Sequence, residues 1–432
     1  MSARLRGLRR GVTVAAVVGS LTVPLAGASA GAAPASTPTT LAGSPLSVFT
    51  ADPPGPTPSA SPTPSLPGTG VRELTPAVAR RLDAAVRDVM READIPGATV
   101  GIWTPDKGNY VRTFGVADKS TGRRMTPDLS MRIGSETKTF TVTALLQLVD
   151  QGKVGLDDPI GKYVDGVPNG NRITLRQLAD MRSGLFSYSD NDDFVKALTS
   201  DPERSFTPQE LLDYSFGHPV LFQPGRKFSY SNTNLILLGL VVEKESGQRL
   251  GDFIGQHILE PAGLKHTVFP SGAEFPNPHA QGYTNQTADG KVANATDWNP
   301  SWGWAAGAMI SRLDDLRVWA RTLATGELPD GGRLVSAATQ RERLKMPPTM
   351  VPGAAYGLGI FDVQGWIGHN GSLPGYESLT VYLPSARATL VVLLNTDITH
   401  KGQEPATLLG RAITTIVSPD HVFNLPAAPA AR

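Results

Sequence analysis

The sequence predicts an α+β domain with one antiparallel sheet built from both ends of the chain, flanking helices and an inserted lobe that is mainly helical. Strand patterns occur near the start and the end of the folded region, whereas short helices and loops dominate residues 157–310. The chain has 432 residues, of which 40% are hydrophobic and 18% are charged. It is therefore long enough to bury a core of this size.

The first 30 residues are typical of a signal peptide. Four arginines precede an apolar run over 12–26, and the small residues Ala28-Ser29-Ala30 follow it. The run is too short to span a bilayer comfortably, and no later segment reaches 18 apolar residues. We therefore expect a secreted, soluble mature chain without a transmembrane segment.

Residues 31–70 are expected to form a disordered linker. They contain ten prolines among small and polar residues, with Asp52 as the only charge, and such a composition cannot bury enough apolar surface to fold. The folded domain is then expected at 71–421, and a second proline-containing segment, 422–432, is expected to be a disordered tail.

Composition narrows the function. Forty Lys and Arg residues against 39 Asp and Glu give a formal charge of +1, without a basic stripe that would indicate nucleic acid as a partner. Cysteine is absent, which excludes thiol nucleophiles, thiolate metal sites and disulfides. Outside the motif discussed below, the histidines have no metal-ligand spacing: His218, His257, His266, His279, His400 and His421. We expect no metal, no cofactor, a small-molecule or peptide substrate, and a monomer.

The N-terminal part of the sheet is predicted as a helix followed by a hairpin. Thr75-Pro76 has the residue types of a helix N-cap and first turn, and the periodic apolar residues that follow end near Ile95-Pro96-Gly97. Apolar or β-branched runs over 98–103 and 110–115 then predict two strands joined by a turn.

The rest of the frame follows the same reasoning. A nearly all-apolar run over 135–150 predicts a helix buried on most sides. Late in the chain we expect strands, a turn and a closing helix, at 357–363, 366–369, 377–383, 384–387 (the turn), 388–395 and 403–416 (the helix).

Ser135 and Lys138 are the first candidate catalytic pair. They lie one turn apart at the start of the buried helix, so their side chains can meet. A serine hydroxyl becomes a good nucleophile when a neighbour takes its proton, and a lysine can do so once burial leaves its amine neutral. The S-x-x-K pattern alone is weak, because an N-capping serine beside a solvated lysine has the same spacing.

Two further motifs carry polar groups at the ends of elements. Tyr230-Ser231-Asn232 precedes an apolar helix, and His369-Asn370-Gly371 lies where a strand ends. A glycine there would allow a substrate backbone to approach closely. Taken separately, each motif also has a purely structural interpretation: Asn232 could cap a helix beside a packed Tyr230, and Gly371 could be a hairpin glycine after a structural His369.

Together and in this order, the three motifs resemble those of the penicillin-recognising serine hydrolases, which include class C β-lactamases and D-alanyl-D-alanine carboxypeptidases. The resemblance is closest to secreted D-alanyl-D-alanine carboxypeptidases of Streptomyces and covers essentially the whole folded region. Flanking stretches agree with it, among them Ser183-Gly184-Leu185, Ala306-Gly307-Ala308 and Tyr356-Gly357-Leu358-Gly359. The resemblance implies a β-lactamase/transpeptidase-like fold.

The resemblance also implies roles for individual residues. Ser135 would be acylated, Lys138 would accept its proton, Tyr230 would relay the proton to the leaving group, and His369 would supply a polar group beside that tyrosine. The remaining implied residues bind substrate: Asn232, Asn370, Gly371, Ser372 and Trp302. The backbone N–H groups of Ser135 and Ser372 would form the oxyanion hole.

Two departures leave the substrate open. Asn370 stands where the family usually has threonine or serine, and Phe361-Asp362 follows Gly-Leu-Gly-Ile where the carboxypeptidases have a carboxylate-binding arginine. We expect a D-alanyl-D-alanine carboxypeptidase acting on peptidoglycan peptides. The alternatives are an esterase or D-amino-acid amidase of the same family, a class C-like β-lactamase, and a non-catalytic wall-binding or penicillin-sensing module.

Overall fold

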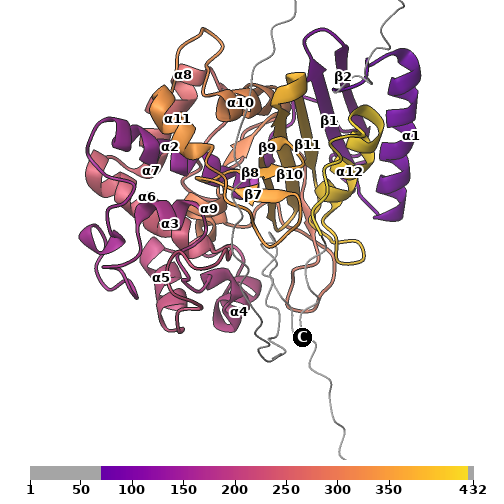
Figure 1. The fold of residues 1–432 in the computed structure, drawn as a ribbon. Coiled ribbons are helices and arrows are strands. Elements are labelled where there is room, and N and C mark those ends of the chain that lie inside the picture. Colours follow the sequence, from indigo (N-terminus) through magenta and orange to yellow (C-terminus); the bar gives the residue numbers. More distant parts are fainter. Residues whose placement is uncertain (1–69, 427–432) are drawn as a thin grey trace, which may run out of the picture. The chain divides into compact units, whose positions relative to one another are not determined.

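The computed structural model describes residues 70–426, so the predicted signal peptide 1–30, residues 31–69 of the predicted linker and residues 427–432 lie outside the described residues. A seven-stranded antiparallel sheet has the order β2-β1-β11-β10-β9-β8-β7 (Figure 1). Its strands are β1 (Gly97–Thr104), β2 (Gly108–Gly115), β7 (Ala354–Tyr356), β8 (Phe361–Val363), β9 (Trp366–Leu373), β10 (Tyr376–Leu383) and β11 (Ala388–Leu394). The predicted sheet from both ends of the chain is confirmed.

Helices cover both faces of this sheet (Figure 1). Helices α1 and α12 pack together on one face, and α10 packs on the other. The helices are α1 (Pro76–Glu92), α2 (Thr137–Asp150), α3 (Leu175–Ala179), α4 (Asp192–Ser200), α5 (Pro208–Phe216), α6 (Asn232–Ser246), α7 (Leu250–Ile254), α8 (Glu260–Ala262), α9 (Trp304–Gly307), α10 (Leu313–Thr325), α11 (Ala337–Arg343) and α12 (Pro405–Val417). None of the helices in the described residues is long and apolar enough to cross a membrane.

The first helix and hairpin form where the sequence predicts them. The Thr75 side chain accepts a hydrogen bond from Val78 N, and Pro76 occupies the first turn of α1. Strands β1 and β2 pair from Gly97↔Gly115 to Thr104↔Gly108. Gly108 has φ +88°, a conformation that favours glycine and closes the tight turn.

The strand predicted over 357–363 is wrong. The structure has two short strands, β7 and β8, separated by a turn in which Gly357 N donates to Ile360 O at 2.8 Å. Gly359 has φ +71°, and a Cβ atom there would lie 2.7 Å from a methyl group of Val142 on α2. The chain therefore has to turn at this glycine, where it passes close to the buried helix.

The region between the two halves of the sheet is mainly helical. Between residues 157 and 310 it contains α3 to α9 and only two-residue strands: β4 (Tyr283–Thr284), β5 (Ala293–Asn294) and the start of β6 (Ile310–Ser311), which pairs with β3 (Met131–Arg132). Helix α2 is buried between this region and α10. Its Phe140 ring stacks on Trp319 of α10 with centroids 4.1 Å apart, and Trp319 Nε1 donates to Thr139 Oγ1 at 2.8 Å.

The ordered C-terminal part continues beyond the predicted boundary at 421. Phe423 is fully buried, its ring lies 5.9 Å from that of Phe361, and its N–H donates to Thr414 Oγ1. Burial of a phenylalanine side chain contributes about 1.5–3 kcal/mol, which explains why the start of the predicted disordered tail packs against α12.

Candidate active site

Ser135 lies in a single 3-10 turn, η1 (Gly134–Glu136), which leads directly into α2. Two glycines allow this turn to approach strand β9. A Cβ atom on Gly134 would lie 2.7 Å from Ser372 N, and one on Gly371 would lie 1.9 Å from Ile133 O. The backbone that approaches Gly371 closely is thus the protein's own turn before Ser135, whereas the sequence predicted a substrate backbone there.

Lys138 is completely buried beside Ser135. Its Nζ atom lies 2.8 Å from Ser135 Oγ and 2.7 Å from the carbonyl oxygen of Ala306, and it sits 4.9 Å above the ring of Tyr230. Since the carbonyl can only accept, one N–H of Lys138 points at Ala306. The Nζ lone pair of a neutral amine is then free to receive the proton of Ser135.

Electrostatics favour this neutral amine. Burial lowers the pKa of Lys138 well below its usual value. Among residues 70–426, no carboxylate forms a salt bridge with Lys138 that would hold its charge. The Ser135–Lys138 pair therefore has the geometry and the protonation state of an activated nucleophile.

Tyr230 precedes α6 and carries a proton that it keeps at neutral pH. Burial raises the pKa of its phenol above the usual range, the Ser135 hydroxyl partly offsets the rise, and Glu404 adds to it. Its hydroxyl oxygen is buried without a hydrogen-bond partner in the described part of the chain. Such a group can donate its proton to a leaving amine next to Ser135.

The two backbone N–H groups of the predicted oxyanion hole, those of Ser135 and Ser372, belong to neighbouring elements, η1 and β9. Ser135 N lies in the first turn of η1, where a backbone N–H has no intrahelical acceptor. Ser372 N faces the same turn, as its distance to the Cβ position of Gly134 indicates. Ser372 N therefore lies next to the turn that holds Ser135, which is the placement that an oxyanion hole made of these two N–H groups requires.

His369 lies on β9 inside a ring of aromatic side chains. Its Nδ1 is 2.5 Å from Asn370 O, and its Nε2 is 3.0 Å from the hydroxyl of Tyr356. Its ring centroid lies 6.3 Å from that of Tyr230 and 5.4 Å from that of Phe361. Burial is the main cause that lowers the pKa of His369, to about 3, so the imidazole is neutral.

Asn232 is the first residue of α6 and is held by two serines. Its N–H donates to Ser187 Oγ at 3.1 Å, and its side-chain Nδ2 donates to Ser189 Oγ at 3.0 Å. These bonds fix the side-chain amide, and no donor to its Oδ1 occurs in the described residues. The oxygen is free to accept an N–H group of a substrate.

The side chains of Asn370 and Ser372, which were predicted to bind substrate, do not point toward Ser135. Side chains alternate along β9, so Asn370 and Ser372 point toward the face covered by α12, where Asn370 Nδ2 donates to Glu404 Oε2 at 2.9 Å. Trp302 packs its ring 6.0 Å from Phe194, and its carbonyl accepts from the Tyr188 hydroxyl. Ser372 reaches the site through its backbone.

Three groups at the site were not predicted as site residues. The carbonyl of Ala306 orients Lys138, the hydroxyl of Tyr356 contacts His369, and the ring of Phe361 packs on the same imidazole. Ala306 and Tyr356 belong to flanking stretches whose resemblance to the family was noted, which was the only available signal. Phe361 was mentioned in the sequence analysis only because it stands where the carboxypeptidases have a carboxylate-binding arginine.

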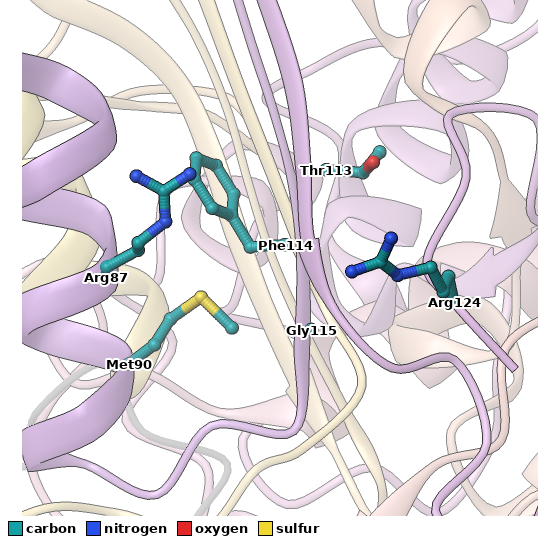
Figure 2. A pocket seen from close by; sticks show the side chains of 6 residues that line it. All are labelled: Arg87, Met90, Thr113, Phe114, Gly115 and Arg124. Atoms are coloured by element: carbon teal, nitrogen blue, oxygen red, sulfur yellow. The ribbon is translucent and has the colours of Figure 1, made fainter. Parts of the chain in front are cut away.

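A cavity of about 310 Å³ lies far along the sheet from this constellation (Figure 2). Arg87, Met90, Phe114 and Arg124 line it, at helix α1 and the edge strand β2. It contains none of the predicted site residues. Within residues 70–426, no group of three or more His, Asp or Glu side chains could hold a metal ion.

Comparison with known proteins identifies the family. A family model described as beta-lactamase matches residues 82–414, which is most of the chain. The chain therefore belongs to the β-lactamase family of serine hydrolases, as the resemblance of its motifs implied. Its fold, with a large antiparallel sheet and flanking helices, is that of this family.

Several curated relatives are named for different activities. The D-aminopeptidase of Brucella anthropi is 30% identical over 331 residues, covering 73% of this chain and 59% of that protein. Protein flp of Staphylococcus aureus is 27% identical over 330 residues, covering 74% of this chain and 64% of that protein. The chain thus spans about 60% of the length of these relatives.

Solved structures are similar over most of their length. A D-stereospecific amidohydrolase from Streptomyces sp. matches with TM-score 0.66 and 30% identity, covering 74% of this chain and 94% of that chain. The D-amino acid amidase of Ochrobactrum anthropi matches with TM-score 0.68 and 27% identity, covering 79% and 97%. A Pyrococcus abyssi homologue, at TM-score 0.64 and 26% identity over 78% and 76%, is described as octameric, so a monomer stays a prediction.

Proposed function

We propose that this protein is a serine D-amidohydrolase, which cleaves an amide bond at the carbonyl group of a D-amino acid residue and releases ammonia or an amine without a carboxylate. The observation that carries the proposal is that, within residues 70–426, the basic side chain found over the Tyr230 ring is Lys138, which the proposed reaction uses as its base. His369 is neutral, and Lys138 gives up its charge to act as the base. A leaving group with a negative charge would find no partner there.

Phe361 supports the proposal that the site does not bind a carboxylate on the leaving group. It stands where the resemblance to the carboxypeptidases implies a carboxylate-binding arginine, and its ring packs on His369. In the described part of the chain, no arginine hydrogen-bonds Ser135, Tyr230 or His369. Loss of a charge-assisted contact weakens binding by about 1.5–3 kcal/mol, or roughly ten- to a hundredfold.

The names of the similar proteins reported above agree with an amide substrate of D configuration. One solved neighbour is a D-stereospecific amidohydrolase and another a D-amino acid amidase, and a curated relative is a D-aminopeptidase. Each of these proteins is similar to this chain over 73–79% of its length, and the proposal extends their kind of substrate to the site of this chain.

The proposed reaction follows from the protonation states. Ser135 Oγ attacks the amide carbonyl while its proton moves to Lys138 Nζ, and the two backbone N–H groups bind the oxyanion. Tyr230 then gives its proton to the leaving nitrogen as the C–N bond breaks, and recovers a proton from Lys138. Water hydrolyses the ester on Ser135, with the same groups acting in reverse.

A D-alanyl-D-alanine carboxypeptidase remains the second candidate. Strand β8 pairs only with residues 366–368 of β9. The edge of β9 over residues 369–373, near Ser135, is therefore not paired with β8. An extended peptide could add to this edge as a further strand. This feature favours a peptide over a very small amide.

The test compares substrates that differ in the leaving group. The folded domain and its Ser135→Ala variant are given D-phenylalaninamide, L-phenylalaninamide, an acyl-D-Ala-D-Ala peptide and a chromogenic cephalosporin. Serine-dependent release of ammonia from the D-amide, faster than from the L-amide and with little release of D-alanine, is expected. Faster serine-dependent cleavage of the peptide or of the cephalosporin would instead support the carboxypeptidase or the β-lactamase.

We also propose that the enzyme acts outside the cytoplasm, on the basis of the signal-peptide pattern in residues 1–30. N-terminal sequencing of protein recovered from the culture medium tests this. A new N-terminus at residue 31 is expected, whereas retention of the intact chain inside cells would contradict export.

A further inference from the structure

Tyr356 is a buried tyrosine without a role in the reaction described above. It ends β7, the edge strand of the sheet, and its ring stands edge-on to both Tyr230 and His369 with interplanar angles of 86° and 89°. Its hydroxyl lies 3.0 Å from His369 Nε2. The enzyme therefore has a second tyrosine at the site, directed at the histidine.

The hydrogen bonds of His369 define its tautomer. Nδ1 lies 2.5 Å from the carbonyl oxygen of Asn370, which can only accept, so Nδ1 carries the hydrogen. In the neutral imidazole Nε2 is then an acceptor, and the Tyr356 hydroxyl must be its donor. The bond from Tyr356 occupies the lone pair that a proton would need.

Among residues 70–426, the groups that surround His369 give an imidazolium no anionic partner. Lys138 on α2 has no negative charge in either protonation state, and it disfavours an imidazolium whenever it is protonated. From β8 it meets the apolar ring of Phe361, and the cross-strand residue on β10 is Thr380. Tyr230, which precedes α6, keeps its proton because burial raises the pKa of its phenol.

Two buried carboxyl groups on the surrounding elements are disfavoured as anions. Burial raises the pKa of Glu136, which lies beside Thr380, to about 8. Burial also raises the pKa of Glu404, the hydrogen-bond partner of Asn370, to about 8. The surroundings of His369 are therefore consistent with a neutral ring on every side.

We propose that Tyr356 is a positioning residue that determines leaving-group specificity: by donating to Nε2 it holds His369 in the uncharged Nδ1–H tautomer and keeps a carboxylate-binding cation out of the site. The effect on leaving-group specificity rests on the proposed function. The effect of Tyr356 on the tautomer of His369 does not depend on any substrate. It accounts for how His369 can lie beside Tyr230 without supplying a charge.

The first test is nitrogen-15 NMR of the histidine side chains, with His369→Gln used to assign the signal. In the wild-type protein His369 should show one protonated nitrogen, Nδ1, and no titration between pH 5.5 and 8. In Tyr356→Phe, which keeps the ring but loses the donor, the population of the other tautomer should increase about tenfold. An unchanged tautomer in Tyr356→Phe would overturn the proposal.

The second test measures specificity. For Tyr356→Phe, the ratio of kcat/KM for D-phenylalaninamide to that for an acyl-D-Ala-D-Ala peptide should fall about tenfold, with KM for the peptide decreasing. Tyr110→Phe is the matched control, because Tyr110 lies on the distant strand β2 and its hydroxyl donates to Asp83 on α1. An unchanged ratio would overturn the specificity role. If the wild-type protein hydrolyses no amide, the proposed function fails while the NMR result still decides the tautomer.

Discussion

The Nζ atom of Lys138 lies 2.8 Å from Ser135 Oγ and 2.7 Å from the carbonyl oxygen of Ala306. The first contact pairs a base with a nucleophile, and the second fixes the direction of the base's lone pair. Because burial also lowers the pKa of Lys138, the pair is ready to react before a substrate binds. The predictions below follow from this arrangement and from the groups around it.

Replacing Lys138 should abolish most of the activity even when a positive charge is kept. Lys138→Ala and Lys138→Arg should each lower kcat/KM by roughly 10²- to 10⁴-fold, since an arginine stays protonated and cannot take the serine proton. Steady-state kinetics with the preferred amide measures this. Lys162→Ala, at an exposed ion pair with Asp158, is the control, and near-normal turnover by Lys138→Arg would disprove the role of a neutral amine.

Tyr230→Phe should slow acylation most for substrates whose leaving group must be protonated. Hydrolysis of an amide should slow by about 10²- to 10⁴-fold, because the leaving nitrogen must be protonated. Acylation by a p-nitrophenyl ester of the same acyl group should slow far less, since its leaving group departs as an anion. Equal losses for both substrates, measured as acylation rates by stopped-flow absorbance, would contradict the assignment of Tyr230 as the acid.

Gly371→Ala should destabilise the enzyme and displace its nucleophile. The added methyl group would meet the Ile133 carbonyl oxygen at 1.9 Å, so η1 has to move away from β9, at a cost of about 1–3 kcal/mol. Urea unfolding and the acylation rate should both report the change. Gly255→Ala, where nothing lies within 4 Å of the added atom, is the matched control, and equal stability of the two variants would refute this packing argument.

Phe361→Arg should shift specificity toward substrates that end in a carboxylate. A guanidinium beside His369 would supply the charge-assisted contact that the site lacks, raising relative kcat/KM for an acyl-D-Ala-D-Ala peptide roughly ten- to a hundredfold. Phe361→Leu removes the ring without adding a charge and serves as the control. The same shift in both variants would mean that the ring, and not the missing charge, determines specificity.

Stability should depend on pH through Glu136. Burial raises the pKa of this carboxyl to about 8 from a usual value of 4.5. Between these values the folded chain holds a proton that the unfolded chain releases, so the free energy of unfolding falls as pH rises. Each unit corresponds to about 1.4 kcal/mol, and the whole window to a few kcal/mol.

Urea unfolding at pH 5 and pH 8.5 tests the contribution of Glu136. Glu136→Gln should lose less stability between the two pH values than the wild-type protein, because the glutamine does not titrate. Glu92→Gln, at an exposed position on α1, should behave like the wild-type protein. A Glu136→Gln variant with the full wild-type dependence would rule out this source.

Much of the fold was predictable because its helices and strands have strong periodic hydrophobic patterns and begin or end at typical capping and turn residues. The helix at Pro76, the hairpin after it and the late strands and closing helix lie within a few residues of their predicted bounds. The strand predicted over 357–363 failed because a glycine with positive φ interrupts an apolar run, and the run itself cannot reveal the turn. Burial of Phe423 depends on a groove that only the folded chain forms.

The site was predictable where one motif carries two side chains on the same element. Ser135 and Lys138 meet because residues three apart share one helix face. Asn370 was expected in the same pocket as His369, but neighbouring residues of a strand point to opposite faces. The contribution of Ala306 is a backbone carbonyl, which no residue type can indicate.

The most direct test of the central claim is to identify the acylated residue. The domain is mixed with a slowly hydrolysed acyl ester, quenched in acid, digested and analysed by mass spectrometry, in parallel with Ser135→Ala. We predict one acyl group on the peptide that contains Ser135 and none in the variant. An acyl group on another residue, or equal labelling of Ser135→Ala, would contradict the account.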